Sequence, residues 1–354
     1  MPPSVDSRLF LIIAHGNATG LIQTFTLDPA TGQLGPPATI EAGASTSFVA
    51  VHPNHRLAYS TQNRSERVTA WVIDPAMAQF RRLGDVAVPG APGVAQVGPA
   101  YVSVDRSGRF VLVANYRGHN AVVFALQPDG GLGALVANVS AGKHAHCVVT
   151  SPDNRIAFVP NLGSDLVAQY RFDDQSGSLT PQDPPAVITA AGAGPRHLVF
   201  APDGRRAYLL TELDATLYGY DYDADRGSLI PTWHVPTLPA DYQGQRWAAD
   251  IHVHPGGRTL YVSNRAHDSL TVFTLDPAGG PPQVAQRISS AGQVPRNFTL
   301  DPAGRFLFVA NQDSGNLVTF AIDPASGQLT QIADRPVGDA PYFVSVVALP
   351  AAAA

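Results

Sequence analysis

GAGPRHLVFAPDGRRAYLLTELDATLYGY (Gly192 to Tyr220) contains one unit of a pattern that recurs along this chain of 354 residues. In each unit a short apolar strand leads into a tight turn ending in Arg, a second apolar strand, a polar break and a third strand. The closing arginines of six such turns are 46 to 53 residues apart: HPNHR (His52 to Arg56), DRSGR (Asp105 to Arg109), SPDNR (Ser151 to Arg155), APDGR (Ala201 to Arg205), HPGGR (His254 to Arg258) and DPAGR (Asp301 to Arg305). This spacing is typical of the blades of a propeller.

The quoted unit predicts where the strands of one blade lie. Leu198 to Ala201 and Ala207 to Thr211 flank the turn, and Thr216 to Asp221 follows the polar break with alternating side chains. A further turn leads to a weakly patterned outer strand, so that each unit provides four antiparallel strands.

The two ends of the chain carry complementary fragments of this unit. The N-terminal segment has a third strand and its turn, TFTLDPATGQL (Thr24 to Leu34), but no first strand, whereas PYFVSVVAL (Pro341 to Leu349) is a first strand with nothing after it. We therefore predict an all-β fold, a seven-bladed β-propeller with one blade shared between the N- and C-terminal segments, as a single domain over residues 1–354.

Composition excludes several classes of protein. The net charge of -5 argues against a nucleic-acid surface, and no apolar run is long enough to span a membrane. The single cysteine, Cys147, excludes an intramolecular disulfide, and the polar Met1 to Arg8 with the short apolar run Leu9 to Ala14 is unlike a signal peptide. We expect a cytoplasmic protein, as a monomer or weak homodimer.

The direction of the strands sorts the loops onto two faces. The Arg-ending turns share one face, whereas the starts of the first strands and the breaks between second and third strands share the other. Most breaks begin with Asn, as at Asn115, Asn161 and Asn264, a residue that favours turns on its own account. Glu212 takes that place in one repeat, where a carboxylate has no such role and indicates either a functional residue or a structural ion pair. Because this face varies between repeats, we expect the functional residues on it.

Three arginines are expected near the channel mouth on this face. Arg196 and Arg296 occupy equivalent positions two repeats apart, and Arg265 comes from the repeat between them. The planar guanidinium matches carboxylates and phosphates, so these residues beside Glu212 indicate an anionic ligand. The alternative is that the arginines cap strand ends.

Histidines also occur at the starts of first strands. His144 and His146 form an H-x-H step, which on one strand would place both imidazoles on the same face. This spacing occurs in metal sites, but no matching third ligand or C-x-x-C is present, so we expect no metal and no cofactor. A channel histidine can also be a core residue with satisfied hydrogen bonds. His197 and His252 occupy similar positions in later repeats.

Four long segments of the chain resemble a known family. They are HAHCVVTSPDNRIAFVPNLGSDLVAQYRFD (His144 to Asp173), GAGPRHLVFAPDGRRAYLLTELDATLYGY (Gly192 to Tyr220), WAADIHVHPGGRTLYVSNRAHDSLTVF (Trp247 to Phe273) and PRNFTLDPAGRFLFVANQDSGNLVTF (Pro295 to Phe320). They are similar to the seven-bladed lactonases, which include bacterial propeller-type 6-phosphogluconolactonases and, more distantly, fungal carboxymuconate lactonising enzymes. Asn161 departs from the pattern, because many relatives carry Asp there.

The resemblance implies catalytic residues and a reaction. A His, two Arg and a Glu have been proposed for the muconate enzymes, and their counterparts by motif are His146, Arg196, Arg265 and Glu212. The implied reaction is hydrolysis of a sugar lactone, with 6-phospho-D-glucono-1,5-lactone of the pentose phosphate pathway as the leading substrate. Glu212 or His146 is the base, and Arg196 and Arg265 are candidates for binding the oxyanion or another anionic group. No G-x-S-x-G motif is present, so water is the expected nucleophile.

Further residues on the variable face are candidates for binding the substrate: His144, His197, Asn264, Arg296, Asn115, Asn161 and His252. Two other functions stay open at this point. One is a cycloisomerase that forms a lactone in aromatic catabolism. The other is a non-catalytic propeller that binds an anionic metabolite or a protein.

Overall fold

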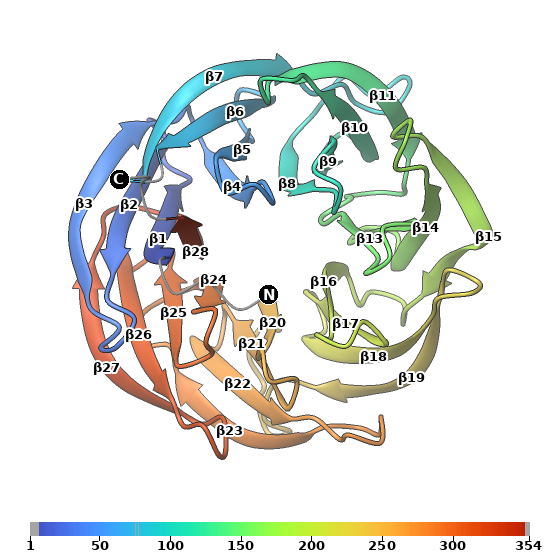
Figure 1. Cartoon of the computed structure of the whole chain (residues 1–354). Helices are drawn as coiled ribbons and strands as arrows, with labels where there is room; N and C mark the ends of the chain where they lie inside the picture. Colours follow the sequence, from blue (N-terminus) through green and yellow to red (C-terminus); the bar gives the residue numbers. More distant parts are fainter. Residues whose placement is uncertain (1–6, 75, 77, 351–354) are drawn as a thin grey trace.

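The chain folds into a ring of seven four-stranded antiparallel sheets, as Figure 1 shows. The computed structural model describes residues 7–74, 76 and 78–350; Met1 to Asp6 and the last four alanines of the predicted domain lie outside this range. Every regular element in the described part is a strand, and no described helix is long and apolar enough to cross a membrane. The predicted seven-bladed β-propeller is therefore confirmed.

Each blade is given below from its inner to its outer strand. Blade 1 holds β28 (Pro341–Pro350), β1 (Ser7–His15), β2 (Leu21–Leu27) and β3 (Leu34–Glu41); blade 2 holds β4 (Thr46–Val51), β5 (Leu57–Gln62), β6 (Arg67–Asp74) and β7 (Gln79–Ala87); blade 3 holds β8 (Pro99–Val104), β9 (Phe110–Asn115), β10 (Asn120–Leu126) and β11 (Leu132–Ser140). Blade 4 holds β12 (Val149–Thr150), β13 (Ile156–Asn161), β14 (Leu166–Phe172) and β15 (Leu179–Ile188); blade 5 holds β16 (Pro195–Phe200), β17 (Arg206–Thr211), β18 (Thr216–Asp223) and β19 (Ser228–Pro236). Blade 6 holds β20 (Ala248–Val253), β21 (Thr259–Asn264), β22 (Ser269–Thr274) and β23 (Gln283–Ser289); blade 7 holds β24 (Pro295–Leu300), β25 (Phe306–Asn311), β26 (Asn316–Ile322) and β27 (Leu329–Pro336).

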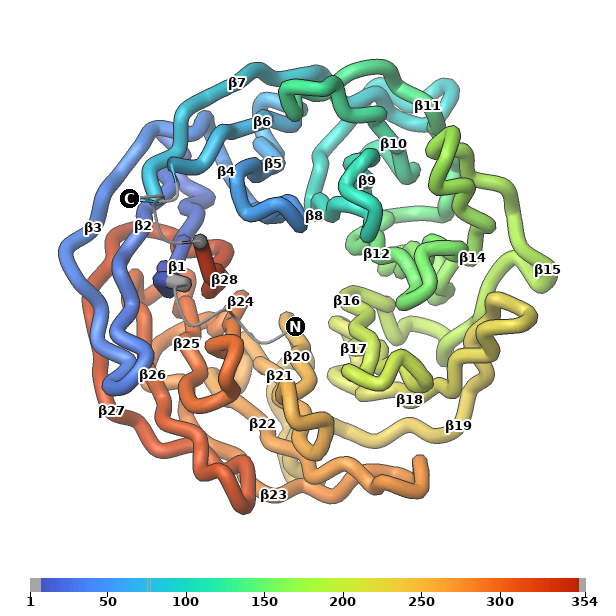
Figure 2. The backbone as a smooth tube through the Cα atoms, in the orientation of Figure 1, coloured from blue at the N-terminus to red at the C-terminus, as the bar shows by residue number. Residues whose placement is uncertain are grey.

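The two ends of the chain complete blade 1 together, as the sequence predicts. β28 pairs with β1 in antiparallel register from Ser7 opposite Pro350 to His15 opposite Pro341. Figure 2 shows the red C-terminal strand beside the blue N-terminal one. This pairing closes the ring and leaves no unpaired strand edge between the first and last repeats.

The six Arg-ending turns share one backbone geometry. In each, the fourth residue donates its N–H to the carbonyl of the first, at 2.8 to 3.0 Å. That fourth residue has a left-handed φ of 58° to 72° in every copy: His55, Gly108, Asn154, Gly204, Gly257 and Gly304. Gly and Asn adopt this conformation at little cost, which explains why they recur at this position.

The hydrophobic core is divided among the interfaces between neighbouring blades. Phe10 and Phe343 of blade 1, for example, pack with Trp71 of blade 2, and six further clusters of buried residues join the other neighbouring pairs. Because the sheets bury their faces against each other, the first residues of the inner strands are free to surround the central channel.

Candidate active site

A β-bulge at the start of the inner strands places the side chains that surround the channel. In five blades the pairing between the two innermost strands skips one residue: Tyr342, Ser47, Ala100, Arg196 and Arg296. In blade 4, Ala145 bridges to Asn161, so His146 holds the same place. A bulge turns one side chain out of the alternation of its strand. Here it directs one residue from each of six blades into the channel.

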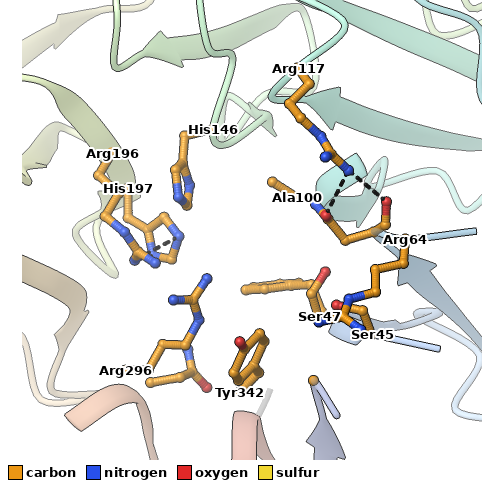
Figure 3. A pocket seen from close by; sticks show the side chains of 14 residues that line it. Ser45, Ser47, Arg64, Ala100, Arg117, His146, Arg196, His197, Arg296 and Tyr342 are labelled. Atoms are coloured by element: carbon orange, nitrogen blue, oxygen red, sulfur yellow. Dashed lines mark hydrogen bonds between the residues drawn. The ribbon is translucent and has the colours of Figure 1, made fainter. Parts of the chain in front are cut away.

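These six residues line a cavity of about 330 Å³ at the mouth of the channel (Figure 3). The other lining residues are Gly16, Ser45, Phe48, Asn63, Arg64, Arg117, His197 and Asn297. Among the described residues, four arginines therefore border the cavity, and no Asp or Glu does. The cavity carries excess positive charge and suits an anionic ligand.

The residues that follow four of the bulges pack against one another beside the cavity. The ring centre of Phe48 lies 4.0 Å from that of Tyr101, 4.6 Å from that of Phe343 and 6.2 Å from that of His197, which comes from the far side of the ring. Tyr101 and His197 are 5.5 Å apart. These four side chains therefore pack together across the channel.

Glu212 lies in a buried cluster of charged groups rather than on the cavity wall. Its Oε2 accepts hydrogen bonds from Arg196 Nε at 2.9 Å and Arg265 Nη2 at 2.7 Å, and its Oε1 accepts one from Trp247 Nε1 at 3.1 Å. Burial alone would raise the pKa of Glu212, but the charges of Arg265 and Arg196 outweigh it, so the pKa is lowered. The carboxylate is ionised, occupied on both oxygens and weakly basic.

The two arginines bound to Glu212 differ in what they face. Arg265 packs its guanidinium 3.9 Å over the ring of Trp247 and donates to the Ala248 carbonyl at 2.9 Å, and its buried Nε has no partner among the described residues. Burial, and next the charge of Arg196, lower the pKa of Arg265 well below its usual value. Arg196 lines the cavity and also donates to the Ala249 carbonyl.

Arg296 faces Arg196 across the same part of the cavity. Its guanidinium lies 4.4 Å over the ring of Tyr342, and Nη1 donates to Gln312 Oε1 at 3.3 Å. Burial, followed by the charge of Arg196, lowers the pKa of Arg296 to about 10. It stays protonated at neutral pH.

A second network beneath Arg196 holds His197 in one orientation. His197 Nδ1 donates to Asp250 Oδ1 at 2.8 Å, which leaves Nε2 to accept from Arg196 Nη1 at 3.2 Å. Asp250 is itself fixed by His252 Nε2 at 3.2 Å and by the amide of Asn297. Burial, together with the charge of Arg196, lowers the pKa of His197 to about 4, so this ring is neutral near pH 7.

His146 is a cavity histidine with an unused nitrogen. It is buried, and its Nδ1 has no hydrogen-bond partner among the described residues. Its ring centre lies 5.3 Å from that of His197 and 5.7 Å from that of Tyr116. Burial, then the charge of Arg196, lowers its pKa well below the usual value. A neutral imidazole with a free lone pair beside arginines is suited to accept a proton from water.

The sequence predictions for the histidine pair were wrong about its geometry. His144 has a φ of 58° and precedes the short strand β12, so the two imidazoles do not project from one strand. His144 stacks on Tyr116, with ring centres 4.4 Å apart, outside the cavity, whereas His146 meets the edge of the same ring.

The three predicted asparagines lie outside the cavity and bond to their own blade or to the segment that links it to the preceding blade. Asn115 Oδ1 accepts from Gly98 N at 2.6 Å, Asn161 Nδ2 donates to Val159 O at 2.6 Å, and Asn264 Oδ1 accepts from Thr237 at 2.7 Å. These contacts match the turn role that Asn favours.

Two further candidates also stand apart from the cavity wall. His252 lies two residues after the buried Asp250 on β20, and Arg265 is joined to Arg196 through Glu212; neither lines the cavity. Their predicted roles in binding substrate and in catalysis stay predictions, and the geometry gives both a supporting position.

Sequence reasoning missed five residues that shape the site: Arg64, Arg117, Tyr342, Trp247 and Asp250. A signal for the first two was present, because each Arg follows within two residues of the Asn that opens its break, as Arg265 does. Tyr342 occupies the same position after Pro as Arg196 and Arg296, but in the half-blade at the C-terminus. For Trp247 and Asp250, no local sequence pattern indicates that they contact Glu212 and His197.

No cluster of three or more His, Cys, Asp or Glu side chains arranged to hold a metal ion is found in the described part of the chain. Asp250 contacts the cavity histidine His197, and its oxygens are also engaged by His252 and Asn297.

Comparison with known proteins adds a family to this geometry. Residues 11–346 match the model of the family described as "Lactonase, 7-bladed beta-propeller". The 6-phosphogluconolactonase of Serratia proteamaculans is 34% identical over 310 residues, covering 88% of this chain and 91% of the relative, and that of Pectobacterium carotovorum is 32% identical, covering 98% and 97%. The solved structure of the periplasmic gluconolactonase of Pseudomonas aeruginosa superposes with a TM-score of 0.87 at 31% identity, covering 97% of this chain and all of that one. The chain therefore belongs to the seven-bladed β-propeller lactonase family, whose members are lactone-hydrolysing esterases.

Proposed function

We propose that this protein hydrolyses a sugar lactone, with 6-phospho-D-glucono-1,5-lactone as the leading substrate and 6-phosphogluconate as the product. The observation that carries the proposal is the position of His146, a buried neutral histidine, in a cavity lined by arginines and, among the described residues, by no acid. Relatives named for phosphorylated and for unphosphorylated lactones are both similar to the chain, so the cavity itself must indicate the substrate.

The proposed reaction begins with His146. Its imidazole takes a proton from a water molecule in the cavity, whose oxygen attacks the carbonyl carbon of the lactone. The carbonyl oxygen becomes an oxyanion, which the guanidinium groups of Arg196 and Arg296 stabilise. The ring C–O bond then breaks, and the leaving alkoxide takes the proton back from the His146 imidazolium. Water and the lactone are thereby converted into the open hydroxy acid, which ionises.

Glu212 has a positioning role in this scheme. The sequence left either Glu212 or His146 as the base, and the contacts of Glu212 favour His146. Since its carboxylate already accepts three hydrogen bonds and has a lowered pKa, it holds Arg196 and Arg265 in place instead of taking a proton. A role in the pentose phosphate pathway, a cytoplasmic location and a monomeric or weakly dimeric state are parts of the same proposal.

The proposal is tested with a panel of lactones. Acid release is followed in a pH-stat above the spontaneous rate of opening, for the protein and for His146→Gln. We expect kcat/KM to fall by about 10²- to 10⁴-fold in the variant, the usual cost of removing a general base.

His144→Gln is the matched control, because this histidine stacks on the same Tyr116 but outside the cavity. It should keep activity within a few-fold. Full activity in His146→Gln would exclude His146 as the base. If the wild-type protein bound phosphosugars but did not accelerate the hydrolysis of any lactone, it would be a non-catalytic propeller that binds an anionic metabolite.

A further inference from the structure

We propose that Arg64 and Arg117 form a second anion subsite, which binds the phosphate of a phosphorylated lactone and selects it over the unphosphorylated one. This inference rests on the proposed lactonase function and adds the residues that determine its specificity.

The two arginines lie across the cavity from the proposed reacting groups. Arg117 follows the end of β9 in blade 3, and Arg64 follows the end of β5 in blade 2. Figure 3 shows both on one side of the cavity, with His146, Arg196 and Arg296 on the other. A ligand that fills the cavity therefore meets a pair of guanidinium groups at each end.

Arg117 is held in place by its surroundings. Its Nη2 donates to the carbonyl of Asn63 at 3.3 Å and to the Oδ1 of Asn63 at 3.2 Å. Its guanidinium also lies directly against Gly98, where an added Cβ would come 2.7 Å from Nε. The missing side chain at Gly98 leaves the room that Arg117 occupies.

The remaining donors of this pair are free to bind a ligand. Among the described residues, Arg117 Nε and Nη1 have no hydrogen-bond partner within the protein, and the same holds for every side-chain nitrogen of Arg64. Both side chains are exposed, and no acid on the cavity wall compensates their charge. Two guanidinium groups match the double charge and the several oxygens of a phosphate.

This end of the cavity is suited to recognition rather than to reaction. His146 lies at the other end (Figure 3). The groups that contact Arg117 are the side-chain amide and the backbone carbonyl of Asn63, neither of which can act as a base. The two ends thus have different roles. The oxyanion forms at Arg196 and Arg296. The phosphate of the same substrate is held at Arg64 and Arg117.

The test compares two substrates that differ only in the phosphate. Initial rates are measured for 6-phospho-D-glucono-1,5-lactone and D-glucono-1,5-lactone with the full chain, Arg64→Ala, Arg117→Ala, the double variant and Gly98→Ala. Each single arginine variant should raise KM for the phosphorylated lactone about tenfold or more, the usual effect of losing a hydrogen bond to a charged group, with kcat little changed. Gly98→Ala keeps both arginines but displaces Arg117, so it should raise the same KM by less.

Arg81→Ala is the matched control, because Arg81 is an exposed arginine of the outer strand β7 in the same blade as Arg64. It should leave both substrates unchanged, and none of the variants should alter KM for the unphosphorylated lactone. An equal loss on both lactones, or no loss on either, would overturn the subsite.

Calorimetry with the two product acids separates this inference from the proposed function. The full chain should bind 6-phosphogluconate at least tenfold more tightly than gluconate, and the double variant should lose that difference. This result would support the subsite even if no lactone were hydrolysed. Equal binding of the two acids by the full chain would refute it, whatever the activity.

Discussion

The arginines at the two ends of the cavity use the same side chain in opposite environments. Arg196 is buried, and Glu212 neutralises part of its charge at 2.9 Å. Arg64 and Arg117 are exposed, and Asn63 provides the hydrogen-bond partner found for Arg117. A buried guanidinium depends on its counter-ion for the stability of the fold, whereas an exposed one is solvated and free to bind a ligand. The two ends should therefore respond differently to mutation, pH and salt.

The largest effect is expected from Glu212→Gln. This change removes the carboxylate that neutralises Arg196 and Arg265 but keeps the size of the side chain. Breaking a buried ion pair on one side typically costs about 3–5 kcal/mol, so the free energy of unfolding in urea should fall by that amount. The activity should fall as well, because Arg196 loses the group that orients it.

Two control variants compare this loss of stability with the effect of substituting exposed charged residues, one of them at the other end of the cavity. Glu41→Gln, at the exposed end of β3, and Arg117→Ala should each change the free energy of unfolding by less than about 0.5 kcal/mol, as surface substitutions usually do. If Glu212→Gln were as mild as these two, the charged cluster would not be needed for stability.

A smaller effect is expected from acid, and it should arise at the buried end. The folded protein lowers the pKa of His197 from about 6.5 to about 4, so between these pH values the unfolded chain binds a proton that the native state does not. The free energy of unfolding is therefore highest above pH 6.5. It decreases as the pH falls toward 4, and His197 accounts for about 3 kcal/mol of this decrease. His146, whose pKa is also lowered, adds to the loss in the same direction.

Urea denaturation at a series of pH values measures this loss. In His197→Gln the slope of stability against pH between 6.5 and 4 should be reduced, because the group that titrates is gone. A slope identical to that of the unchanged protein would show that His197 is accessible to protons in the native state.

The smallest effect is expected from salt, at the exposed end. Ionic strength screens exposed charges over about 8–10 Å and affects buried pairs much less. Raising NaCl from about 0.05 to 0.5 M should increase KM for the phosphorylated lactone a few-fold, while kcat and KM for the unphosphorylated one stay nearly constant. A salt effect of the same size on both lactones would mean that the exposed arginines do not contact the phosphate.

The fold was open to prediction because its determinants are local. Each turn needs a left-handed residue at its fourth position, and Gly, Asn or His provides one in all six copies. The incomplete repeats at the two ends indicated the shared blade in the same way. Pro341–Pro350 is a first strand without the three strands that follow it, and the N-terminal segment has those three strands without a first one.

The site was open to prediction only in part. Arg196, Arg296 and His146 were assigned to the variable face, and all three line the cavity. The sequence did not indicate that Glu212 lies behind the cavity wall, because this depends on contacts with Arg265 and Trp247 from the next blade. Such contacts join residues that are 35 or more positions apart, and no local periodicity encodes them.

The bulges at the starts of the inner strands have a consequence for how this cavity can diverge. Each bulge residue is unpaired in its sheet, so its identity is independent of the register that holds the blade together. The present set includes Arg196, Ala100 and Tyr342 at equivalent places, which are residues of different size and charge. One substitution at such a position changes the chemistry of the cavity without changing the pairing of the strands, although at Arg196 it also breaks the buried ion pair with Glu212. The paired strands thus stay constant while the bulge residues vary, and new substrate preferences can be selected by single substitutions at the bulge positions.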